Sequence, residues 1–281
     1  MAHKVYCKQF QVPLNASLDL ADIDPDFKSH HENKAAAQDE IAHYAKRMRE
    51  LQYLLYAENR RSLLIVLQAM DAGGKDGTIR HVLGYMNPQG CRVAAFKVPS
   101  TNEAAHDFLW RVHRRAPACG EVTVFNRSHY EDVLVTRVHK LIPKKTWQAR
   151  YAQINAFEKL LVENGTHILK FFLHISAEEQ LQRFHKRLKD PARHWKISEA
   201  DYSERQYWED YQHAYTDALN HCNSKQAPWY VIPANHKWFR NLAISRIVVE
   251  TLEGLNMQFP EPRVDINAIR QKYHRLANGD N

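Results

Sequence analysis

The stretch SLLIVLQAMDAGGKDGTIRHVL, residues 62–83, decides the fold. Its first eight residues are mostly apolar and rich in branched side chains, as in a strand buried on both faces of a parallel sheet. Three glycines and Lys75 follow within a few residues, and the helical pattern IRHVL comes next. A strand, a glycine-rich loop and a helix in this order are typical of a phosphate-binding site, because glycines let the backbone turn its N–H groups inward.

Four further short apolar runs resemble the first, and helical patterns separate them. These runs span residues 92–98, 121–125, 168–175 and 229–233. The apolar spacing predicts helices over residues 35–58, 77–86, 102–115, 147–163, 177–188, 201–220 and 237–253. Strands that alternate with helices predict an α/β fold with a five-stranded parallel sheet, because parallel neighbours need helical crossovers.

The chain has 281 residues, of which 44% are apolar and 25% charged, so it is globular rather than collagenous, coiled-coil or disordered. This length suits one large domain with an appendage. We expect an arm over residues 1–34, a main domain over 35–255 and a surface tail over 256–281. No apolar run reaches the 20 or so residues that a bilayer requires, and nothing marks a secretory signal. We therefore expect a cytoplasmic protein without membrane contact.

The four cysteines are far apart and form no zinc-binding spacing, which predicts reduced thiols. The net charge is +7, with 39 basic and 32 acidic side chains. An excess of this kind suggests an anionic partner but does not establish one, because many basic proteins bind no polyanion.

The loop after the first strand is the first candidate site. Lys75 places a positive charge there for a terminal phosphoryl group. Compared with the pattern G-x-x-x-x-G-K-[ST], Ala69 replaces the first glycine and Asp76 replaces the magnesium-binding hydroxyl. Asp71 would repel phosphate unless a cation lay between them, so we expect it to bind Mg²⁺. The alternative is a tight turn with a solvated lysine, although the glycines would then cost backbone entropy without need. The predicted phosphate-binding residues of the loop are Gly73, Gly74, Lys75, Asp76, Gly77 and Thr78.

A second candidate site follows the third strand, in the sequence NRSHYEDVL that begins at Asn126. Ligands of open parallel sheets bind at the carboxyl ends of the strands, so this segment should face the loop and bring Arg127 to the phosphates. Asn126 stands where a P-loop enzyme usually has a magnesium-binding Asp, so Glu131 or Asp71 would replace that carboxylate. Alternatively, Glu131 and Asp132 are acids at a helix start, where the helix dipole favours them.

A third candidate site is the basic sequence RFHKRLKDPARHWK, which begins at Arg183 and has six positive charges against one negative. Arg183 and Arg187 share a helix face, whereas the following proline ends the helix and leaves Arg193 and Lys196 on a loop. We expect residues 183–200 to close as a lid that supplies cations and excludes water during phosphoryl transfer. The alternative is a solvated, charged helix end.

Further basic side chains follow the second strand, at Lys97, Arg111, Arg114 and Arg115. Opposite the lid they would line a groove. A long polyanion needs so many cations, whereas the phosphates of a single nucleotide do not. The predicted nucleotide-binding residues are Lys97, Arg111, Arg115, Asn126 and Glu131.

Four ordered blocks of the sequence resemble the polyphosphate kinase 2 family: LQAMDAGGKDGTIRHVL, FKVPSTNEAAHDFLWRVHRRAP, VFNRSHYEDVLVTRV and the lid with DPARHWKIS. The resemblance covers residues 30–255 and implies a three-layer P-loop kinase fold similar to thymidylate kinase, with a helical lid. It implies reversible transfer of the terminal phosphate of polyphosphate to AMP or ADP, with Mg²⁺ or Mn²⁺. The sequence SHYEDVLV differs from the SWYNRAG pattern of single-acceptor members and resembles the class III branch, which accepts both nucleotides.

The resemblance also implies roles for individual residues. Lys75 and the loop amides would hold phosphates, Asp71 would help to hold Mg²⁺ and Arg127 would grip the transferring group. The lid would complete the charge clamp with Arg183, Arg187, Arg193 and Lys196. The predicted catalytic residues are Lys75, Arg127, Arg187 and Asp71, and the predicted metal ligands are Asp71 and Glu131. Members of the family form dimers or tetramers, which implies a homo-oligomer here.

Two other functions fit parts of the sequence. An ATP-dependent nucleoside or nucleotide kinase would share the scaffold, but the imperfect loop and the surplus of cations count against it. A nucleic-acid-binding protein would explain the basic charge, with Trp195 and Trp208 near basic residues. No helix-turn-helix, zinc finger or RNA-recognition signature is present, so we expect no nucleic-acid partner.

Overall fold

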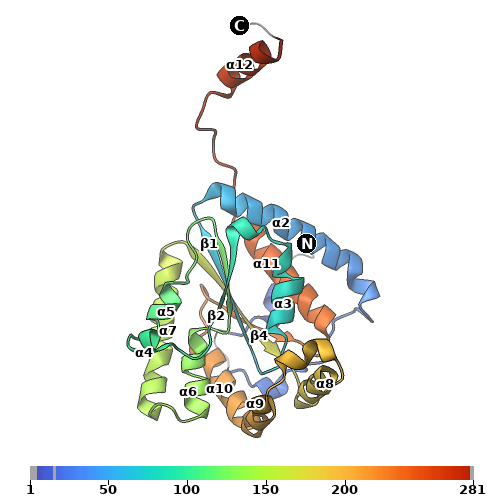
Figure 1. Cartoon of the computed structure of the whole chain (residues 1–281), viewed down its shortest axis with the longest axis vertical. Helices are drawn as coiled ribbons and strands as arrows, with labels where there is room; N and C mark the ends of the chain where they lie inside the picture. Colours follow the sequence, from blue (N-terminus) through green and yellow to red (C-terminus); the bar gives the residue numbers. More distant parts are fainter. Residues whose placement is uncertain (1–4, 15–16, 279–281) are drawn as a thin grey trace.

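The computed structural model describes residues 5–14 and 17–278, and its centre is a five-stranded sheet between two layers of helices (Figure 1). The strands are β1 (Ser62–Ala69), β2 (Cys91–Ala95), β3 (Val122–Asn126), β4 (Thr166–His174) and β5 (Trp229–Pro233). Their spatial order is β2-β3-β1-β4-β5, and every neighbouring pair is parallel. The predicted α/β fold with five parallel strands is therefore confirmed.

Helices connect the strands and extend the chain at both ends. The α-helices are α1 (Val5–Phe10), α2 (Gln38–Glu58), α3 (Lys75–His81), α4 (Thr101–Ala104), α5 (Trp110–His113), α6 (Val135–Val138), α7 (Lys144–Glu163), α8 (Ala177–Leu188), α9 (Glu199–Ser203), α10 (Trp208–His221), α11 (Lys237–Gly254) and α12 (Ile266–Asn278). The 3₁₀ helices are η1 (Leu20–Asp22), η2 (Ala35–Ala37), η3 (Leu83–Tyr85), η4 (Pro88–Gly90), η5 (His129–Asp132), η6 (Pro191–Lys196) and η7 (Glu204–Tyr207).

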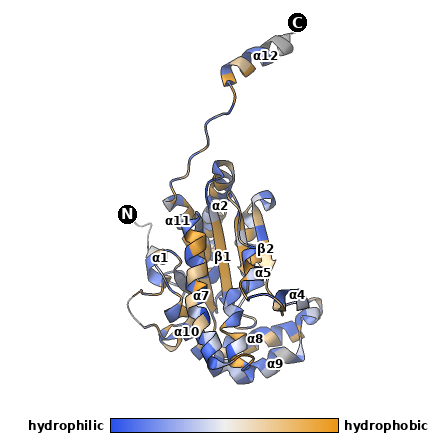
Figure 2. Cartoon of the chain, turned by 90° about the vertical axis from the view of Figure 1, so that its left-hand side faces the viewer, coloured by the Kyte–Doolittle hydropathy of each residue, from blue (hydrophilic) through white to orange (hydrophobic). Residues whose placement is uncertain are grey.

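The central strand β1 contributes to the core on both of its faces, and all eight of its residues are buried. Leu63, Ile65 and Leu67 pack in one apolar cluster with residues of α2, α3 and α11. Leu64 and Val66 pack in a second cluster with residues of α7 and α10. Figure 2 shows the hydrophobic strands enclosed by helices with hydrophilic outer surfaces. The almost continuous apolar run of β1 thus reflects burial on two faces.

The N-terminal arm packs against the main domain. Tyr6 and Phe10 of α1 are buried against Phe239 of α11. Gln11 forms an antiparallel bridge with Tyr230, so the arm runs along the outer edge of β5. The edge strand β5 is thereby covered, whereas β2 at the opposite edge is largely exposed.

The predicted helix over residues 102–115 is wrong as a single element, because the structure divides it into α4 and α5. Asp107 lies at the break, and its side chain accepts a hydrogen bond from the backbone N–H of Leu109. Such local side-chain hydrogen bonds compete with the helix. The helix predicted over 201–220 is likewise divided into α9, η7 and α10.

The predicted surface tail over residues 256–281 contains a helix that the sequence analysis did not predict. Figure 1 shows α12 standing away from the main domain at the end of an extended segment. In the described part of the chain, no helix is both long and apolar enough to cross a bilayer. The four cysteines, which all lie in that part, form no disulfide, as the sequence predicts.

Candidate active site

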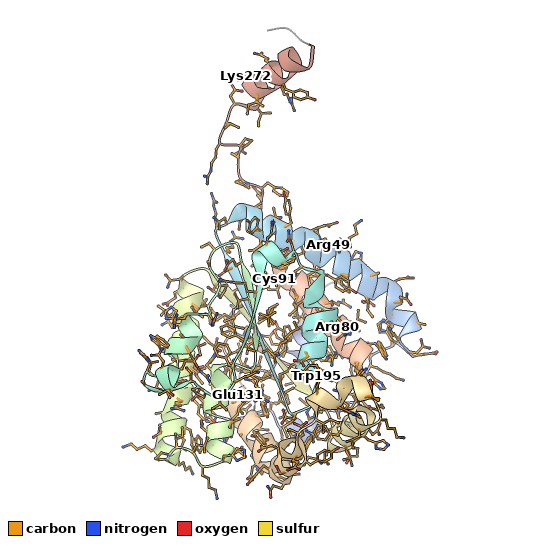
Figure 3. All side chains as sticks on the ribbon, in the orientation of Figure 1. Arg49, Arg80, Cys91, Glu131, Trp195 and Lys272 are labelled. Atoms are coloured by element: carbon orange, nitrogen blue, oxygen red, sulfur yellow. The ribbon has the colours of Figure 1, made fainter. Side chains whose placement is uncertain are left out.

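A cleft of about 1300 Å³ lies at the carboxyl ends of the strands, where the loop after β1 faces the lid (residues 183–200). Figure 3 labels two of its lining residues, Arg80 on α3 and Trp195 in the lid. The described lining includes twelve Lys or Arg residues and four Asp residues. A cleft with such an excess of one charge concentrates ligands of the opposite charge, so this one favours anions.

The glycines of the loop are required by close contacts. Gly74 has φ +108°, a conformation that side chains rarely adopt. A Cβ atom at this position would also overlap the Arg240 guanidinium. A Cβ atom at Gly73 would lie 2.8 Å from the Met70 carbonyl oxygen. The glycine cluster is therefore part of a tightly packed turn.

Arg183 holds this turn from beneath. Its Nη1 donates to the carbonyls of Ala72 (2.9 Å) and Gly73 (3.0 Å), its Nη2 donates to the carbonyl of Ala234, and its Nε donates to Glu179 Oε1 (2.7 Å). Because the peptide group is planar and trans, a Gly73 carbonyl that points at Arg183 directs the next N–H group the opposite way. Arg183 therefore fixes the orientation of the loop backbone.

The Lys75 ammonium lies over the end of β1, where its Nζ donates to the Ala69 carbonyl at 2.8 Å. Burial lowers the pKa of Lys75, and the nearby Asp71 carboxylate opposes this shift. A partly desolvated cation of this kind interacts strongly with an anion that enters the cleft.

Arg127 lies between two carboxylates at the end of β3. Its Nη2 donates to Asp71 Oδ1 at 3.2 Å, and its Nη1 lies 3.8 Å from Glu131 Oε2. Burial raises the pKa of Glu131, although the charges of Arg127 and Lys75 oppose it. The predicted meeting of the loop and the 126–134 segment is therefore present in the structure.

Asp76 connects three parts of the site. Its Oδ1 accepts a hydrogen bond from Asn126 Nδ2 (3.0 Å), and its Oδ2 accepts one from Lys196 Nζ of the lid (3.0 Å). Burial alone raises the pKa of Asp76. The two hydrogen bonds, together with the charges of Lys196 and Lys75, lower it overall. The residue that replaces the usual hydroxyl thus joins the loop to the lid.

Two further cations of the lid are paired with nearby carboxylates. Arg187 Nη1 lies 3.4 Å from Asp201 Oδ2, and Arg193 Nε lies 2.8 Å from Asp190 Oδ2. Both arginines line the cleft. The helix α8 ends at Leu188, before the predicted break at Pro191.

The structure brings most of the predicted site residues to one cleft. Those that line it are Asp71, Gly73, Gly74, Lys75, Asp76, Gly77, Lys97, Asn126, Arg127, Arg183, Arg187, Arg193 and Lys196. Glu131 lies just behind Arg127, and Figure 3 labels its position on the far side of the sheet from Arg80.

Besides Glu131, three predicted residues are not among those that line the cleft. Arg111 is buried and donates to the Lys97 carbonyl at 2.8 Å, while Arg115 is exposed at the end of the broken helix. The two arginines were predicted to lie on one helix over residues 102–115, which the structure divides into α4 and α5. Thr78 is fully buried behind the loop, so its hydroxyl does not face the cleft.

Several cations of the cleft were not predicted. They are Lys34, Arg80, Lys186, Lys237 and Arg240. Arg240 is 2% exposed, and burial together with the charge of Arg183 lowers its pKa to about 9. The sequence did contain a signal for two of these residues, since Lys237 and Arg240 follow the carboxyl end of β5 and the same crevice rule applies there.

Comparison with known proteins identifies the family of this chain. The family model described as "Polyphosphate kinase 2 (PPK2)" matches residues 31–260, which is most of the chain. The chain belongs to the polyphosphate kinase 2 family. The match includes every residue named above as lining the cleft.

Relatives in the polyphosphate kinase 2 family match nearly the whole chain. The "AMP/ADP-polyphosphate phosphotransferase" of Meiothermus ruber is 52% identical over 256 residues, which cover 91% of this chain and 96% of the relative. The "ADP-polyphosphate phosphotransferase" of Rhodopseudomonas palustris is 44% identical over 270 residues, which cover 92% and 93%. The crystal structure of polyphosphate kinase 2 from Arthrobacter aurescens TC1 superposes with a TM-score of 0.93 at 41% identity and covers 97% of this chain and 98% of that one.

Proposed function

We propose that the protein transfers the terminal phosphate of inorganic polyphosphate to AMP and ADP, reversibly and with Mg²⁺. The observation that carries this proposal is the charge of the cleft, with twelve Lys or Arg against four Asp among its described lining residues. The family supports the same conclusion, since two relatives that match nearly the whole chain are named as polyphosphate phosphotransferases.

The donor side of the cleft is the part beyond the loop. Lys34, Arg80 and Lys237 line the cleft in addition to Lys75, Arg127 and the lid cations. The phosphates of a single nucleotide would need only some of these cations. A polyanion with many repeating charges would contact more of them, which favours polyphosphate over ATP as the donor.

The acceptor side is formed by the ends of β2 and β3. Phe96, Lys97 and Val98 line the cleft there, next to Asn126 and Arg127. The exposed apolar side chain of Val98 and the Lys97 cation next to it suit a nucleotide, which has a flat base and charged phosphates. The relative named for both AMP and ADP supports a site that takes both acceptors, and the relative named for ADP supports ADP.

The residues of the site fit a magnesium ion that arrives with phosphates. Among the described residues, no group of three or more His, Cys, Asp or Glu side chains is placed to hold a metal ion by itself. Mg²⁺ usually binds through one or two carboxylates plus substrate phosphates, and Asp71 and Glu131 provide two carboxylates near Lys75. When bound, Mg²⁺ would neutralise charge on the phosphates. We assign Asp71 and Glu131 as its ligands, and Mn²⁺ would fit the same oxygen donors.

The phosphoryl transfer depends on the positioning of donor and acceptor and on cations that stabilise the transition state. Phosphoryl transfer has a loose transition state with its charge on the equatorial oxygens, and Lys75, Arg127 and Arg187 line the cleft where that charge would develop. An acceptor phosphate oxygen is already ionised near neutral pH, so no general base is needed. The lid would exclude water that would otherwise compete as the acceptor.

A homo-oligomer and a cytoplasmic location belong to the proposal as well. The basis of the first is the family resemblance, and light scattering coupled to gel filtration would measure the mass. A dimer or tetramer is expected, and a monomeric mass at working concentration would contradict it.

The function is tested by incubating the protein with long-chain polyphosphate, Mg²⁺ and either AMP or ADP, and separating the nucleotides by chromatography. ADP and ATP from AMP, together with ATP from ADP, are the expected products. ATP from ADP alone would keep the donor and remove AMP as an acceptor. No product from polyphosphate, together with transfer from ATP to another acceptor, would assign the protein to the ATP-dependent kinases instead.

A further inference from the structure

A buried ion pair lies behind the segment that carries Arg127, outside the cleft. Lys170 of β4 and Glu158 of α7 are 0% and 3% exposed, and Lys170 Nζ lies 2.6 Å from Glu158 Oε2. Neither residue lines the cleft. The proposed chemistry does not use either of them, so their presence in the core needs a different explanation.

The pair is bonded directly to η5, the helix that follows β3. Glu158 Oε1 accepts hydrogen bonds from the Tyr130 hydroxyl (2.7 Å) and from His129 Nε2 (3.2 Å). Lys170 Nζ donates to the Tyr130 oxygen (3.0 Å) and to the Cys222 carbonyl (2.6 Å). Each of the three Lys170 protons therefore has an acceptor, and the charged pair is fully engaged.

The segment held by these bonds carries three residues of the site, Asn126, Arg127 and Glu131. Arg127 has φ +62°, a left-handed conformation that is uncommon for a residue other than glycine. Such a conformation persists when the surrounding structure enforces it. The required restraint must act on the backbone on both sides of Arg127.

Restraints of this kind are present on both sides. On one side, the Arg127 N–H donates to the Leu67 carbonyl of β1 at 3.2 Å. On the other side, Ser128 Oγ accepts bonds from Gln68 Nε2 (3.0 Å) and from the Tyr130 N–H (3.2 Å). Tyr130 itself is fixed by the buried pair, so the chain from Lys170 to Arg127 is continuous.

Stability alone is a weak reason to keep such a pair. Burying two charges costs desolvation energy, and apolar residues of similar size are often equally stable or more so. A charged pair adds specificity, because its directional hydrogen bonds are satisfied by only one arrangement of the neighbouring groups. Here the neighbours are His129 and Tyr130, two and three residues after Arg127.

We propose that Glu158 and Lys170 are positioning residues for phosphoryl transfer, which act through His129 and Tyr130 to hold Arg127 in its left-handed conformation facing Asp71. This inference rests on the proposed function. Neither residue touches substrate. Their contribution appears in the rate of transfer, because Arg127 has to meet the transferring group in one orientation.

The test replaces both charges in the full chain, as Glu158→Leu with Lys170→Met, so that no unpaired charge is buried. We expect a folded protein whose kcat for ATP formation from polyphosphate and ADP falls about 100-fold, the size of effect that a 1 Å displacement produces. The KM for polyphosphate should change less than about threefold, because the loop and lid bind the donor. A milder variant, Tyr130→Phe, keeps the ion pair and removes the hydrogen bonds of the Tyr130 hydroxyl with Glu158 and Lys170. Its kcat should fall about fivefold.

Two comparisons separate positioning from loss of stability. Leu252→Ala removes a buried side chain of α11 far from the segment, so it should lower the melting temperature and leave kcat within twofold. In an Arg127→Ala background, the double replacement should cause no further loss of kcat, because its effect passes through Arg127.

The proposal would be overturned if the double replacement and Tyr130→Phe folded and kept the wild-type kcat. It would also be overturned if the double replacement lowered kcat by the same factor in the Arg127→Ala background as in the wild type. The wild-type rate in the same series reports the proposed function separately. If the wild type forms ATP and the variants match it, the positioning role fails while the function stands. If the wild type forms none, the function fails and the positioning role fails with it.

Discussion

Two arginines that line the cleft, Arg183 and Arg193, differ in burial and in their hydrogen-bond partners. Arg183, beneath the loop, has a side chain that is 5% exposed and donates to backbone carbonyls and to Glu179. Arg193, in the lid, has a side chain that is 55% exposed and pairs with Asp190 three residues away. Arg183 is part of the core around the loop, whereas the ion pair of Arg193 lies within its own segment.

This difference indicates a division of labour between the loop and the lid. The loop is fixed before any ligand arrives, because the bonds of Arg183 and the packing of Gly73 and Gly74 determine its backbone. Exposed ion pairs such as the one between Lys196 and Asp76 are worth at most about 1 kcal/mol, so the lid can open at little cost. We expect the loop to orient phosphates and the lid to close over them.

The largest effect is expected from the loop. Lys75→Ala should fold normally and reduce kcat by about 10²- to 10³-fold, as for other preorganised groups that stabilise transition-state charge. Steady-state ATP formation from polyphosphate and ADP measures this effect. Lys159→Ala, at an exposed position of α7, is the matched control and should keep the wild-type rate. Near-normal turnover by Lys75→Ala would remove the loop from the mechanism.

Stability should separate Arg183, which is buried beneath the loop, from Arg193, which is exposed in the lid. Arg183→Met leaves loop carbonyls and Glu179 without a donor, so the free energy of unfolding should fall by about 3 kcal/mol. Arg193→Met should change it by less than about 0.5 kcal/mol, as for most exposed positions. Chemical denaturation of both variants gives the two values. Equal losses would contradict the contrast between loop and lid.

The lid helix should contribute to the rate less than the loop does. Arg187→Gln is expected to lower kcat about tenfold, since other lid cations still face the cleft. Arg187→Lys keeps the charge but loses the planar fork, so its rate should lie between those of the wild type and Arg187→Gln. An unchanged rate in Arg187→Gln would exclude this residue from the transfer step.

The smallest effect is expected from the contact between lid and loop. Lys196→Gln should raise the KM for polyphosphate about threefold at low salt, and the difference should shrink as ionic strength rises. Combined with Asp76→Asn, it should cost little beyond the single changes, because both remove one ion pair. A double-mutant cycle with KM as readout measures this coupling. Fully additive losses would show that the two side chains act separately.

The sequence predicted the sheet and the loop because both depend on local patterns. The apolar run of β1, the glycines and Lys75 are adjacent in the chain, and the crevice rule placed Arg127 opposite them. The resemblance to the family then predicted polyphosphate as the donor and AMP or ADP as the acceptor. The residues alone did not identify either substrate.

The unpredicted parts depend on which helix face meets the cleft. Arg80 lies on a helix with many polar residues, and only the packed structure shows that it lines the cleft. Arg111 was predicted from a continuous helix, but the helix is divided near Asp107 and the Arg111 side chain donates to the Lys97 carbonyl. The contact between Asp76 and Lys196 joins residues 120 positions apart, which no local pattern encodes.

Amide hydrogen exchange with and without long-chain polyphosphate tests the contrast between loop and lid most directly. In the free protein we expect slow exchange in the loop at residues 70–78 and fast exchange in the part of the lid that follows α8, residues 189–200. Polyphosphate should slow exchange in the lid several-fold and change the loop little, because the loop is already ordered. Fast exchange in the loop of the free protein, or no effect of polyphosphate on the lid, would contradict this account.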